Sequence, residues 1–385
     1  MQLLCRGDSG RAVVEVRAAL RQFGVLAAPR AGRAEDEVDD AVEDAVRAFQ
    51  QRRGLITDGI VGGATYRALR EAGWTLGDRQ LALLISTPMS GDDVTMLQER
   101  LLELGFDPGR PGGVFDERTE GALRKFQREY GLVADGMCGP ATLRSLKQLG
   151  RKVTGGRPHL LREQELLRQA GPRMRGKRIV IDPGHGGMDR GVSVNGVHEA
   201  DLMWDLARRI VGRMTATGME AMLSRREDTC PAEAERAAFA NNAGADLVLS
   251  LHTDANHSMH AQGLATYHFG NGSGAISTVG EALGGLIQRE LLTRTGMVDC
   301  RTQARTWELL RLTRMTAVRV EVGYLTHIGD RRKLLDPDFR DIVAEGVLVG
   351  VKRLYLLGQD DQPTGTFTFS DVLARELERG GAQAI

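Results

Sequence analysis

The sequence predicts a multidomain protein with two small three-helix bundles, followed by an α/β domain whose largely parallel sheet is flanked by helices. Three observations lead to this fold class. The chain has 385 residues, which is too long for one ordinary core. Its first half contains an internal repeat. Its second half alternates apolar, β-branched runs with longer amphipathic stretches, as βαβ units do.

The repeat is found by sliding the sequence over itself. The segment "RAFQQRRGLITDGIVGGATYRAL" aligns without a gap with "RKFQREYGLVADGMCGPATLRSL", at a constant offset of 77 residues that places Phe49 on Phe126 and Gln50 on Gln127. Upstream, "LRQFGV" matches "LLELGF" at a slightly different offset. Each unit should therefore contain a helix, a variable loop, a second helix, a glycine turn and a third helix. The expected units are residues 1–75 and 88–150.

The second half begins after residues 151–176, a segment with basic ends, glycines and prolines that we expect to be a linker. The α/β domain is expected over residues 177–357 and a tail over residues 358–385. The expected strands are residues 178–181, 220–224, 246–252, 263–269 and 317–322. The expected helices are residues 199–214, 232–243, about 275–295, and a last helix that ends near residue 357.

Charge and composition exclude several classes of function. The 51 basic residues balance 51 acidic ones without a block of five like charges, so neither a nucleic acid nor an anionic membrane is the expected partner. The N-terminus lacks the apolar segment of a secretory signal, and no stretch is long enough to span a membrane. The four cysteines lie far apart and form no CxxC pair, which suits reduced thiols. We therefore expect a cytoplasmic protein.

Four residues that can bind a metal or transfer a proton lie at or near the ends of expected elements. His185, His252 and Glu321 lie at or just after strands, and Glu199 stands where a helix begins. Ligands of open α/β sheets bind beyond the carboxyl ends of the strands, so these groups can converge. Two imidazoles and one carboxylate make an open zinc site, with His185, Glu199 and His252 as ligands. Glu321 then remains as the base that takes a proton from the attacking water and passes it to the leaving amine.

Each of these residues, taken alone, leaves other interpretations open. Most single histidines that follow a strand do not bind a metal. The run "GHGGMDRG" would also suit a glycine turn that binds phosphate, although it departs from G-x-G-x-x-G and the next helix is delayed by about twelve residues. In the repeats, Phe49 and Phe126 fit a helical core better than a contact with a ligand.

Four ordered motifs together resemble the zinc amidase family of N-acetylmuramoyl-L-alanine amidases, often called Amidase_3, over about residues 177–357. The motifs are the run from Ile181 to Gly191, "GVHEADLMWDLA", the run from Arg236 to His252, and "EVGYLTHIGD". The resemblance implies that His185, Glu199 and His252 bind Zn²⁺, that Glu321 is catalytic, and that the enzyme cuts peptidoglycan between muramic acid and its stem peptide. Two positions depart from the family pattern: His327 stands where the family usually has Asn, and Thr253-Asp254 alters the usual "HANA". Neither departure removes a ligand.

The two repeats resemble the small three-helix peptidoglycan-binding domain, whose pattern runs "AV..FQ...GL..DG..G..T...L". The resemblance covers about residues 6–72 and 90–149. The second repeat keeps the turn Gly139-Pro140, whereas the first has Gly62-Gly63. Peptidoglycan or a muropeptide is therefore the implied partner.

The whole architecture resembles the actinobacterial CwlM group, whose members act inside the cell on precursor synthesis. This resemblance implies an alternative function: a cytoplasmic, amidase-like regulator whose tail docks on a protein partner, an early enzyme of peptidoglycan precursor synthesis. Phosphorylation of Thr364, Thr366 or Thr368, before a short amphipathic helix, would control the docking, unless the tail simply packs on the amidase domain. A binding module for peptidoglycan fragments is a third possibility. We expect an active amidase, because the ligands and Glu321 are retained.

Overall fold

The computed structural model describes residues 3–28, 35–84, 86–149, 158–272, 274–356 and 362–381. Its contacts divide the chain into two compact units. Met1–Arg162 with Gly270–Ala275 form the first unit, and Glu163–Phe269 with Ile276–Ile385 form the second. The first unit contains a separate hydrophobic core for each repeat, and the second contains one large core.

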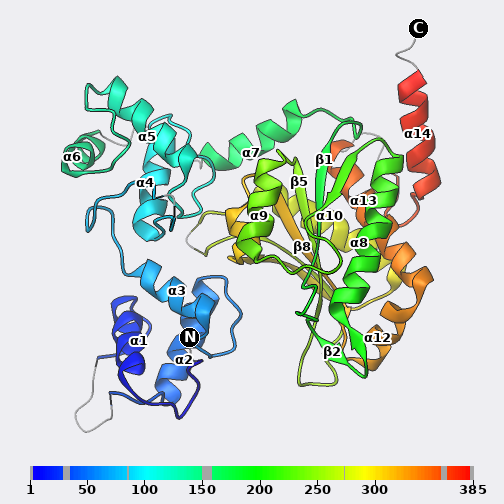
Figure 1. Ribbon diagram of the computed structural model, residues 1–385, viewed down its shortest axis with the longest axis horizontal. Coiled ribbons are helices and arrows are strands. Elements are labelled where there is room, and N and C mark those ends of the chain that lie inside the picture. Colours follow the sequence, from blue (N-terminus) through cyan, green and yellow to red (C-terminus); the bar gives the residue numbers. More distant parts are fainter. Residues whose placement is uncertain are drawn as a thin grey trace. The chain divides into compact units, whose positions relative to one another are not determined.

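Both repeats are three-helix units, as the sequence predicts (Figure 1). The helices are α1 (Arg11–Gln22), α2 (Asp40–Arg52) and α3 (Gly63–Ala72) in the first repeat, and α4 (Asp92–Glu103), α5 (Glu117–Glu129) and α6 (Pro140–Gln148) in the second. Equivalent aspartates cap the middle helices: Asp39 accepts a hydrogen bond from the N–H of Val42, and Asp116 from that of Thr119. The equivalent phenylalanines of α2 and α5 are fully buried, which agrees with the core interpretation.

A buried glutamine holds the glycine turn of each repeat against its middle helix. The side chain of Gln50 makes four hydrogen bonds, with Oδ1 of Asp58 at 2.7 Å, the carbonyl of Ile60 at 3.0 Å, the hydroxyl of Thr65 at 3.1 Å and the N–H of Gly59 at 2.9 Å. Gln127 makes the same four bonds to the residues 77 positions later, at 2.8, 3.0, 3.1 and 2.9 Å. The residues that the repeats share are therefore the partners of one buried polar network.

We expect Gln50→Leu to destabilise the first repeat by about 1–3 kcal/mol, because its buried partners would lose their hydrogen bonds. The neighbouring Gln51 is exposed, so Gln51→Leu is the matched control. Hydrogen exchange followed by mass spectrometry, over peptides that cover α2 and α3, measures the difference. Equal protection of these peptides in both variants would contradict a structural role for Gln50.

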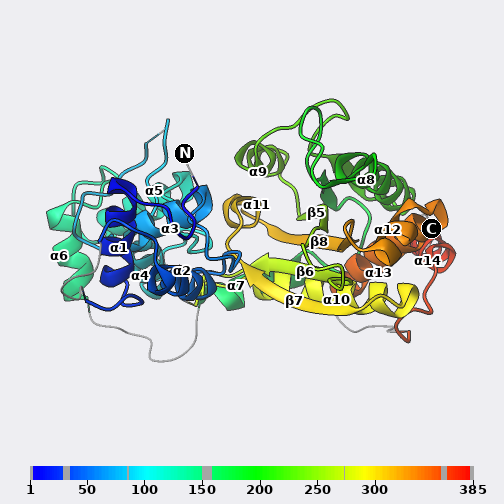
Figure 2. The same ribbon diagram turned by 90° about the horizontal axis from the view of Figure 1, so that it is seen from below.

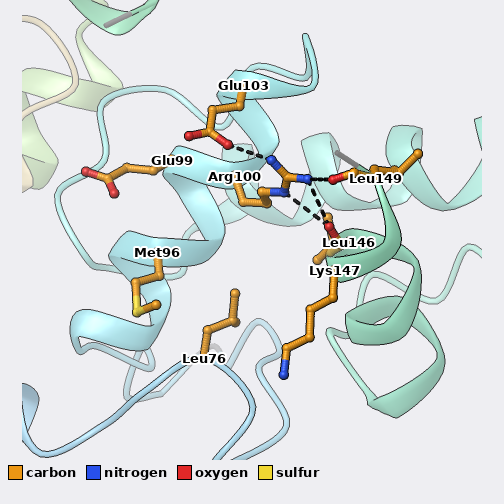
Figure 3. A pocket seen from close by; sticks show the side chains of 8 residues that line it. All are labelled: Leu76, Met96, Glu99, Arg100, Glu103, Leu146, Lys147 and Leu149. Carbon is orange, nitrogen blue, oxygen red and sulfur yellow. Dashed lines mark hydrogen bonds and ion pairs between the residues drawn. The ribbon is translucent and has the colours of Figure 1, made fainter. Parts of the chain in front are cut away.

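The second repeat also contains a pocket of about 380 Å³ between α4 and α6 (Figure 3). Arg100, on α4, donates from Nε to the carbonyl of Leu146 at 3.1 Å and forms an ion pair with Glu103 at 2.6 Å. This guanidinium satisfies a carbonyl at the end of α6 that no helical N–H can reach. The lining combines apolar groups with charges of both signs, contributed by Leu76, Met96, Glu99, Arg100, Glu103, Leu146, Lys147 and Leu149.

A six-stranded sheet with the order β4-β1-β5-β8-β6-β7 forms the centre of the second unit. The strands are β1 (Arg178–Pro183), β4 (Glu220–Leu223), β5 (Leu247–Asp254), β6 (Leu264–Phe269), β7 (Asp299–Arg305) and β8 (Thr316–Tyr324). All neighbouring pairs are parallel except β6 and β8. Two short strands, β2 (Ser193–Val194) and β3 (Val197–His198), form a separate hairpin. The prediction of a largely parallel sheet is confirmed.

Helices cover both faces of this sheet, also as predicted. On one face, α8 (Glu199–Ala216), α10 (Thr278–Thr295) and α13 (Pro337–Leu356) share a core with Ile179, Leu249 and Val318. Figure 2 shows α9 (Glu233–Asn242) and α11 (Glu308–Leu312) on the side of the sheet opposite α10. Among the described residues, no helix is both long and apolar enough to cross a membrane.

Two elements were not predicted from the sequence. β7 was missed because its sequence, "DCRTQAR", lacks an apolar run; it lies at one edge of the sheet and, among the described strands, pairs with β6. The predicted last helix is α13, which ends at Leu356, and a further helix, α12 (Ile328–Leu335), precedes it. Pro337 separates the two helices, because proline is favoured at the first position of a helix.

Part of the expected linker is helical. Residues 151–157 lie outside the described residues, and α7 (Pro158–Gln169) follows them. Glu163, on α7, accepts hydrogen bonds from the N–H of Val279, at 3.3 Å, and from the hydroxyl of Ser277. A carboxylate in this position is favourable, because the N-terminus of α10 carries a partial positive charge.

The described part of the tail packs against α10 and α13. Phe367 and Val372 are buried in the large core, with 4% and 0% of their surfaces exposed. The N–H of Gly365 donates to the buried carboxylate of Glu290, on α10, at 3.1 Å. The described part of the tail includes α14 (Phe369–Gly381), where Leu377 remains 68% exposed. The tail is thus part of the second unit's core, which was one of the two alternatives from the sequence.

Candidate metal centre

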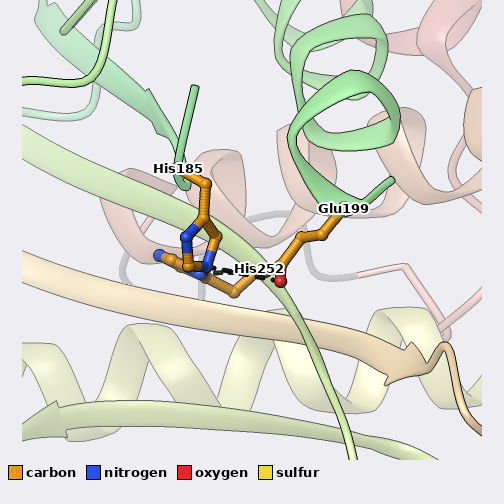
Figure 4. Close-up of side chains that lie close together, drawn as sticks. All are labelled: His185, Glu199 and His252. Carbon is orange, nitrogen blue, oxygen red and sulfur yellow. Dashed lines mark hydrogen bonds and ion pairs between the residues drawn. The ribbon is translucent and has the colours of Figure 1, made fainter. Parts of the chain in front are cut away.

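The structure brings His185, Glu199 and His252 together at the carboxyl edge of the sheet (Figure 4). His185 follows β1, Glu199 begins α8 and His252 lies in β5. Nε2 of His185 lies 3.3 Å from Oε2 of Glu199, and Nδ1 of His252 lies 3.1 Å from Oε1. One candidate ligand atom from each residue lies within 4.8 Å of the other two. The three predicted ligands therefore converge from distant parts of the sequence.

The loop after β1 holds His185 in an uncommon backbone conformation. Its φ is 56°, in the left-handed region that non-glycine residues rarely adopt. Arg236 compensates for this by donating to the carbonyl of His185 at 2.8 Å. Asp189, four residues later, contacts Nδ1 of the same histidine at 2.8 Å, which leaves Nε2 directed at Glu199. The side chain is thus oriented from both ends.

Backbone amides hold the carboxylate of Glu199, which is only 1% exposed. The N–H of Val192 donates to Oε2 at 3.0 Å, and the N–H of Thr253 donates to Oε1 at 2.9 Å. Burial alone would raise the pKa of Glu199, but the hydrogen bonds from His185 and His252 outweigh it and lower the pKa. This carboxylate is therefore ionised and fixed before any ligand arrives.

The histidines differ in their electrostatic surroundings. Burial, followed by the positive charge of Arg319, lowers the pKa of His252 to about 4, so its imidazole is neutral at pH 7. The hydrogen bond to Glu199 raises the pKa of His185, against the effect of burial. A metal ion replaces a proton on such an imidazole, because only the neutral ring can donate its lone pair.

The donor set fits zinc. Tetrahedral zinc sites take histidine nitrogens at about 2.0–2.1 Å and carboxylate oxygens at about 2.0–2.2 Å, which places neighbouring ligand atoms roughly 3.3–3.6 Å apart. The observed separations, 3.3 Å to Oε2 and 3.1 Å to Oε1 of Glu199, involve different carboxylate oxygens, and one candidate atom from each residue lies within 4.8 Å of the other two. Small side-chain rotations would bring the three atoms to this spacing. Asp189 supplies the carboxylate that commonly orients a metal-binding histidine through its other nitrogen. Three protein ligands also leave a fourth position for water or substrate, as in catalytic sites.

Glu321 lies beside this cluster but is not part of it. It is on β8, directly opposite His252 in the register with β5, and is 6% exposed. Nη2 of Arg319 donates to its Oε1 at 3.0 Å, and Tyr267 is a second hydrogen-bond partner. Burial raises the pKa of Glu321 to about 7, although Arg319 acts in the opposite direction. A carboxyl group with this pKa can both accept and release a proton near neutral pH.

Sequence reasoning did not identify Asp189, Arg236, Arg319 or Tyr267 as contributors. Asp189 and Arg236 lie inside the first and third family motifs, so the sequence did contain a signal for them. Arg319 and Tyr267 gave no signal, because their role depends on the register of β6 and β8. His327 stands where the family usually has Asn. Its side chain accepts a hydrogen bond from the N–H of Asp330 at 3.2 Å and caps α12. It is not part of the cluster of His185, Glu199 and His252.

A parallel sheet with a His-Glu-His cluster at its carboxyl edge and a buried carboxylate beside it defines a class of α/β hydrolases with a metal-type ligand set. The comparisons specify the family. Residues 179–353 match the N-acetylmuramoyl-L-alanine amidase family, and residues 9–69 and 90–146 match the peptidoglycan binding domain. The N-acetylmuramoyl-L-alanine amidase CwlM of Mycobacterium tuberculosis is 53% identical over 97% of this chain and 95% of its own length. The chain belongs to the N-acetylmuramoyl-L-alanine amidase family.

Two more distant relatives each match about half of this chain. The N-acetylmuramoyl-L-alanine amidase LytC of Bacillus subtilis is 33% identical over 180 residues, which are 47% of this chain and 36% of that protein. The crystal structure of an N-acetylmuramoyl-L-alanine amidase from Clostridium difficile 630 is 27% identical, covers 49% of this chain and 100% of its own, and has a TM-score of 0.45. The resemblances drawn from the sequence, to this family and to the CwlM group, are confirmed.

We expect Gly184→Ala to weaken zinc binding about 10–100-fold, as changes behind a metal ligand commonly do. An added Cβ at Gly184 would lie 2.3–2.7 Å from three ring atoms of His252, so the ring must move. In Gly212→Ala, the control, the added methyl group meets nothing within 4 Å. Competition with a chromophoric chelator measures the affinity. Identical zinc affinity in the Gly184→Ala and Gly212→Ala variants would contradict the assignment of His252 as a ligand.

Proposed function

We propose that this amidase depends on zinc and hydrolyses the amide bond between muramic acid and the L-alanine of peptidoglycan. The observation that carries the proposal is the His-Glu-His cluster with a separate buried carboxylate, Glu321, on the neighbouring strand. We assign His185, Glu199 and His252 as the ligands and Glu321 as the catalytic residue. When bound, zinc polarises the amide carbonyl and lowers the pKa of water toward about 7.

In the proposed reaction, Glu321 moves the proton. The oxygen of water forms a bond to the carbonyl carbon of the muramic acid lactyl group, while Glu321 accepts a proton from that water. The bond between this carbon and the alanine nitrogen then breaks, and Glu321 delivers the proton to the departing nitrogen. The pKa of Glu321, raised by burial to about 7, suits both steps because neither protonation state is strongly favoured at neutral pH.

We further propose that the two repeats bind peptidoglycan or a muropeptide and so raise the local concentration of substrate around the amidase domain. The support is their match to the peptidoglycan binding domain. The domain boundaries of this proposal are residues 1–75 and 88–150 for the repeats, 151–176 for the linker, 177–357 for the amidase domain and 358–385 for the tail.

Glu321→Gln is expected to retain zinc and to lose about 10²–10⁴-fold in turnover, the usual effect of removing a general base. Glu199→Gln should instead lose zinc, because an amide is a much weaker ligand than a carboxylate. Zinc content by mass spectrometry and release of stem peptide from purified muropeptides are measured on the same preparations. Full turnover in Glu321→Gln would assign proton transfer to another group.

The alternative function is a cytoplasmic regulator of peptidoglycan precursor synthesis that acts through the tail. Two observations favour it. Thr366 and Thr368 are exposed on either side of the buried Phe367, and Leu377 presents an exposed apolar side chain on α14. The four cysteines form no disulfide, which suits a reducing compartment. A phosphate on Thr366 or Thr368 would add nearly two negative charges where a kinase can reach the hydroxyl.

Phosphorylation of Thr368 should release the start of α14. Its hydroxyl and N–H both bond to Asp371, at 2.7 and 2.9 Å, and a phosphate there would repel that carboxylate. The test captures an early enzyme of precursor synthesis from cytosol, before and after phosphatase treatment, with a variant that replaces Thr364, Thr366 and Thr368 by Ala. We expect binding to depend on phosphate in the unchanged protein and to lose this dependence in the variant without the three threonines.

The exposed Ser370→Ala variant is the control for the capture experiment. Point variants are preferable to truncation, because deletion of the tail would also remove Phe367 and Val372 from the large core. If all variants bind the same amount of this enzyme with and without phosphatase, the tail is a structural element and the regulatory alternative fails.

A further inference from the structure

Arg319, two positions before Glu321, directs its positively charged guanidinium toward the carboxylate of Glu321. Successive side chains of a strand alternate between faces, so Arg319 and Glu321 share one face of β8. The distance from Nη2 of Arg319 to Oε1 of Glu321 is 3.0 Å, and the two side chains are 18% and 8% exposed. In a partly desolvated site, such a charge-assisted hydrogen bond is both strong and directional.

An aromatic pair holds the guanidinium of Arg319 in this position. The guanidinium carbon lies 4.2 Å from the centre of the Trp307 ring, a favourable cation–π distance. The ring of Trp307 packs in turn on that of Tyr267, with centres 4.6 Å apart. Tyr267 is directly opposite Arg319 in the register of β6 and β8, and it is also a hydrogen-bond partner of Glu321.

We propose that Arg319 is a positioning residue that fixes the carboxylate of Glu321 in one orientation for proton transfer. The proposal rests on the function of Glu321 proposed above. Arg319 is assigned no contact with the substrate, because its Nε is buried and the guanidinium is packed between Trp307 and Glu321. Its effect on the reaction is therefore exerted through Glu321.

Groups from two neighbouring strands also face Glu321. His252 and Tyr267 come from β5 and β6, and Asp254 lies at the end of β5. Among the described residues, Nη2 of Arg319 makes an ion pair with Oε1 of Glu321. Without Arg319, the carboxylate would lose this charge-assisted hydrogen bond and be freer to rotate.

The experiment compares Arg319→Met, Arg319→Lys and Arg305→Met as zinc-loaded full chains. Arg305 is the matched control: its guanidinium stacks on Tyr267 at 5.3 Å, but it donates to Gln303 and Ala304 rather than to Glu321. We expect Arg319→Met to lower kcat by about 10–100-fold, the effect of a small misplacement of a catalytic group, while KM stays within about twofold. Arg319→Lys should restore part of kcat, and Arg305→Met should leave kcat unchanged.

Unchanged or increased kcat in Arg319→Met would overturn the proposal, and so would a loss confined to KM. A double-mutant cycle of Arg319→Met and Glu321→Gln, read from the melting temperature, tests the interaction without turnover. We expect Glu321→Gln to shift the melting temperature by a different amount in the Arg319→Met variant than in the unchanged protein. Strictly additive shifts would show that the two residues do not interact and would also overturn it.

The two measurements separate this proposal from the proposed function. If the unchanged protein, loaded with zinc, releases no stem peptide, the assignment of amidase chemistry to this site fails. The double-mutant cycle still decides whether Arg319 fixes Glu321, because it requires no substrate.

Discussion

The candidate metal centre depends on a buried ion pair beneath it. Oδ1 of Asp182, in β1, lies 2.8 Å from Nη1 of Arg236, in α9, and their side chains are 2% and 5% exposed. A buried charge is tolerated only when it is paired and its remaining hydrogen-bonding capacity is used. Asp182 also accepts from the hydroxyls of Ser224 and Ser250, while Arg236 donates to the carbonyl of His185. The pair therefore joins β1, β5, the residue after β4 and α9 to the backbone of His185.

The same physical requirement organises the repeats. Gln50 and Gln127 are buried in small domains that offer few alternatives for polar groups, and each uses its amide to satisfy an aspartate, a carbonyl, a hydroxyl and a backbone N–H. If one of these partners were lost, another buried polar group would lack its hydrogen bond, so both repeats keep all the partners. This explains why the repeats remain alike at these positions while their loops differ.

Charge is distributed unevenly around the centre, and one cation affects two neighbours. Burial, followed by the positive charge of Arg319, lowers the pKa of His252 and keeps that imidazole neutral, and Arg319 also counteracts the effect of burial on Glu321. Glu199 keeps its negative charge through the hydrogen bonds from His185 and His252, and the backbone amides of Val192 and Thr253 also donate to its carboxylate. Glu199, a proposed ligand, and Glu321, the proposed base, are both carboxylates, yet burial and partners make the first an anion and the second a group that titrates near neutral pH.

The sequence by itself determined the repeats, the α/β class and the four residues of the candidate site. These follow from local pattern: a 77-residue offset, the periods of strands and helices, and polar residues at strand ends, which a parallel sheet brings to one edge. Only the tertiary structure decided that β7 is a strand, since its sequence lacks an apolar run and it forms by pairing with β6. Tertiary structure also decided that Phe367 of the tail enters the core and that Arg319 faces Glu321. Docking and strand register arise from contacts between distant segments, which no local pattern encodes.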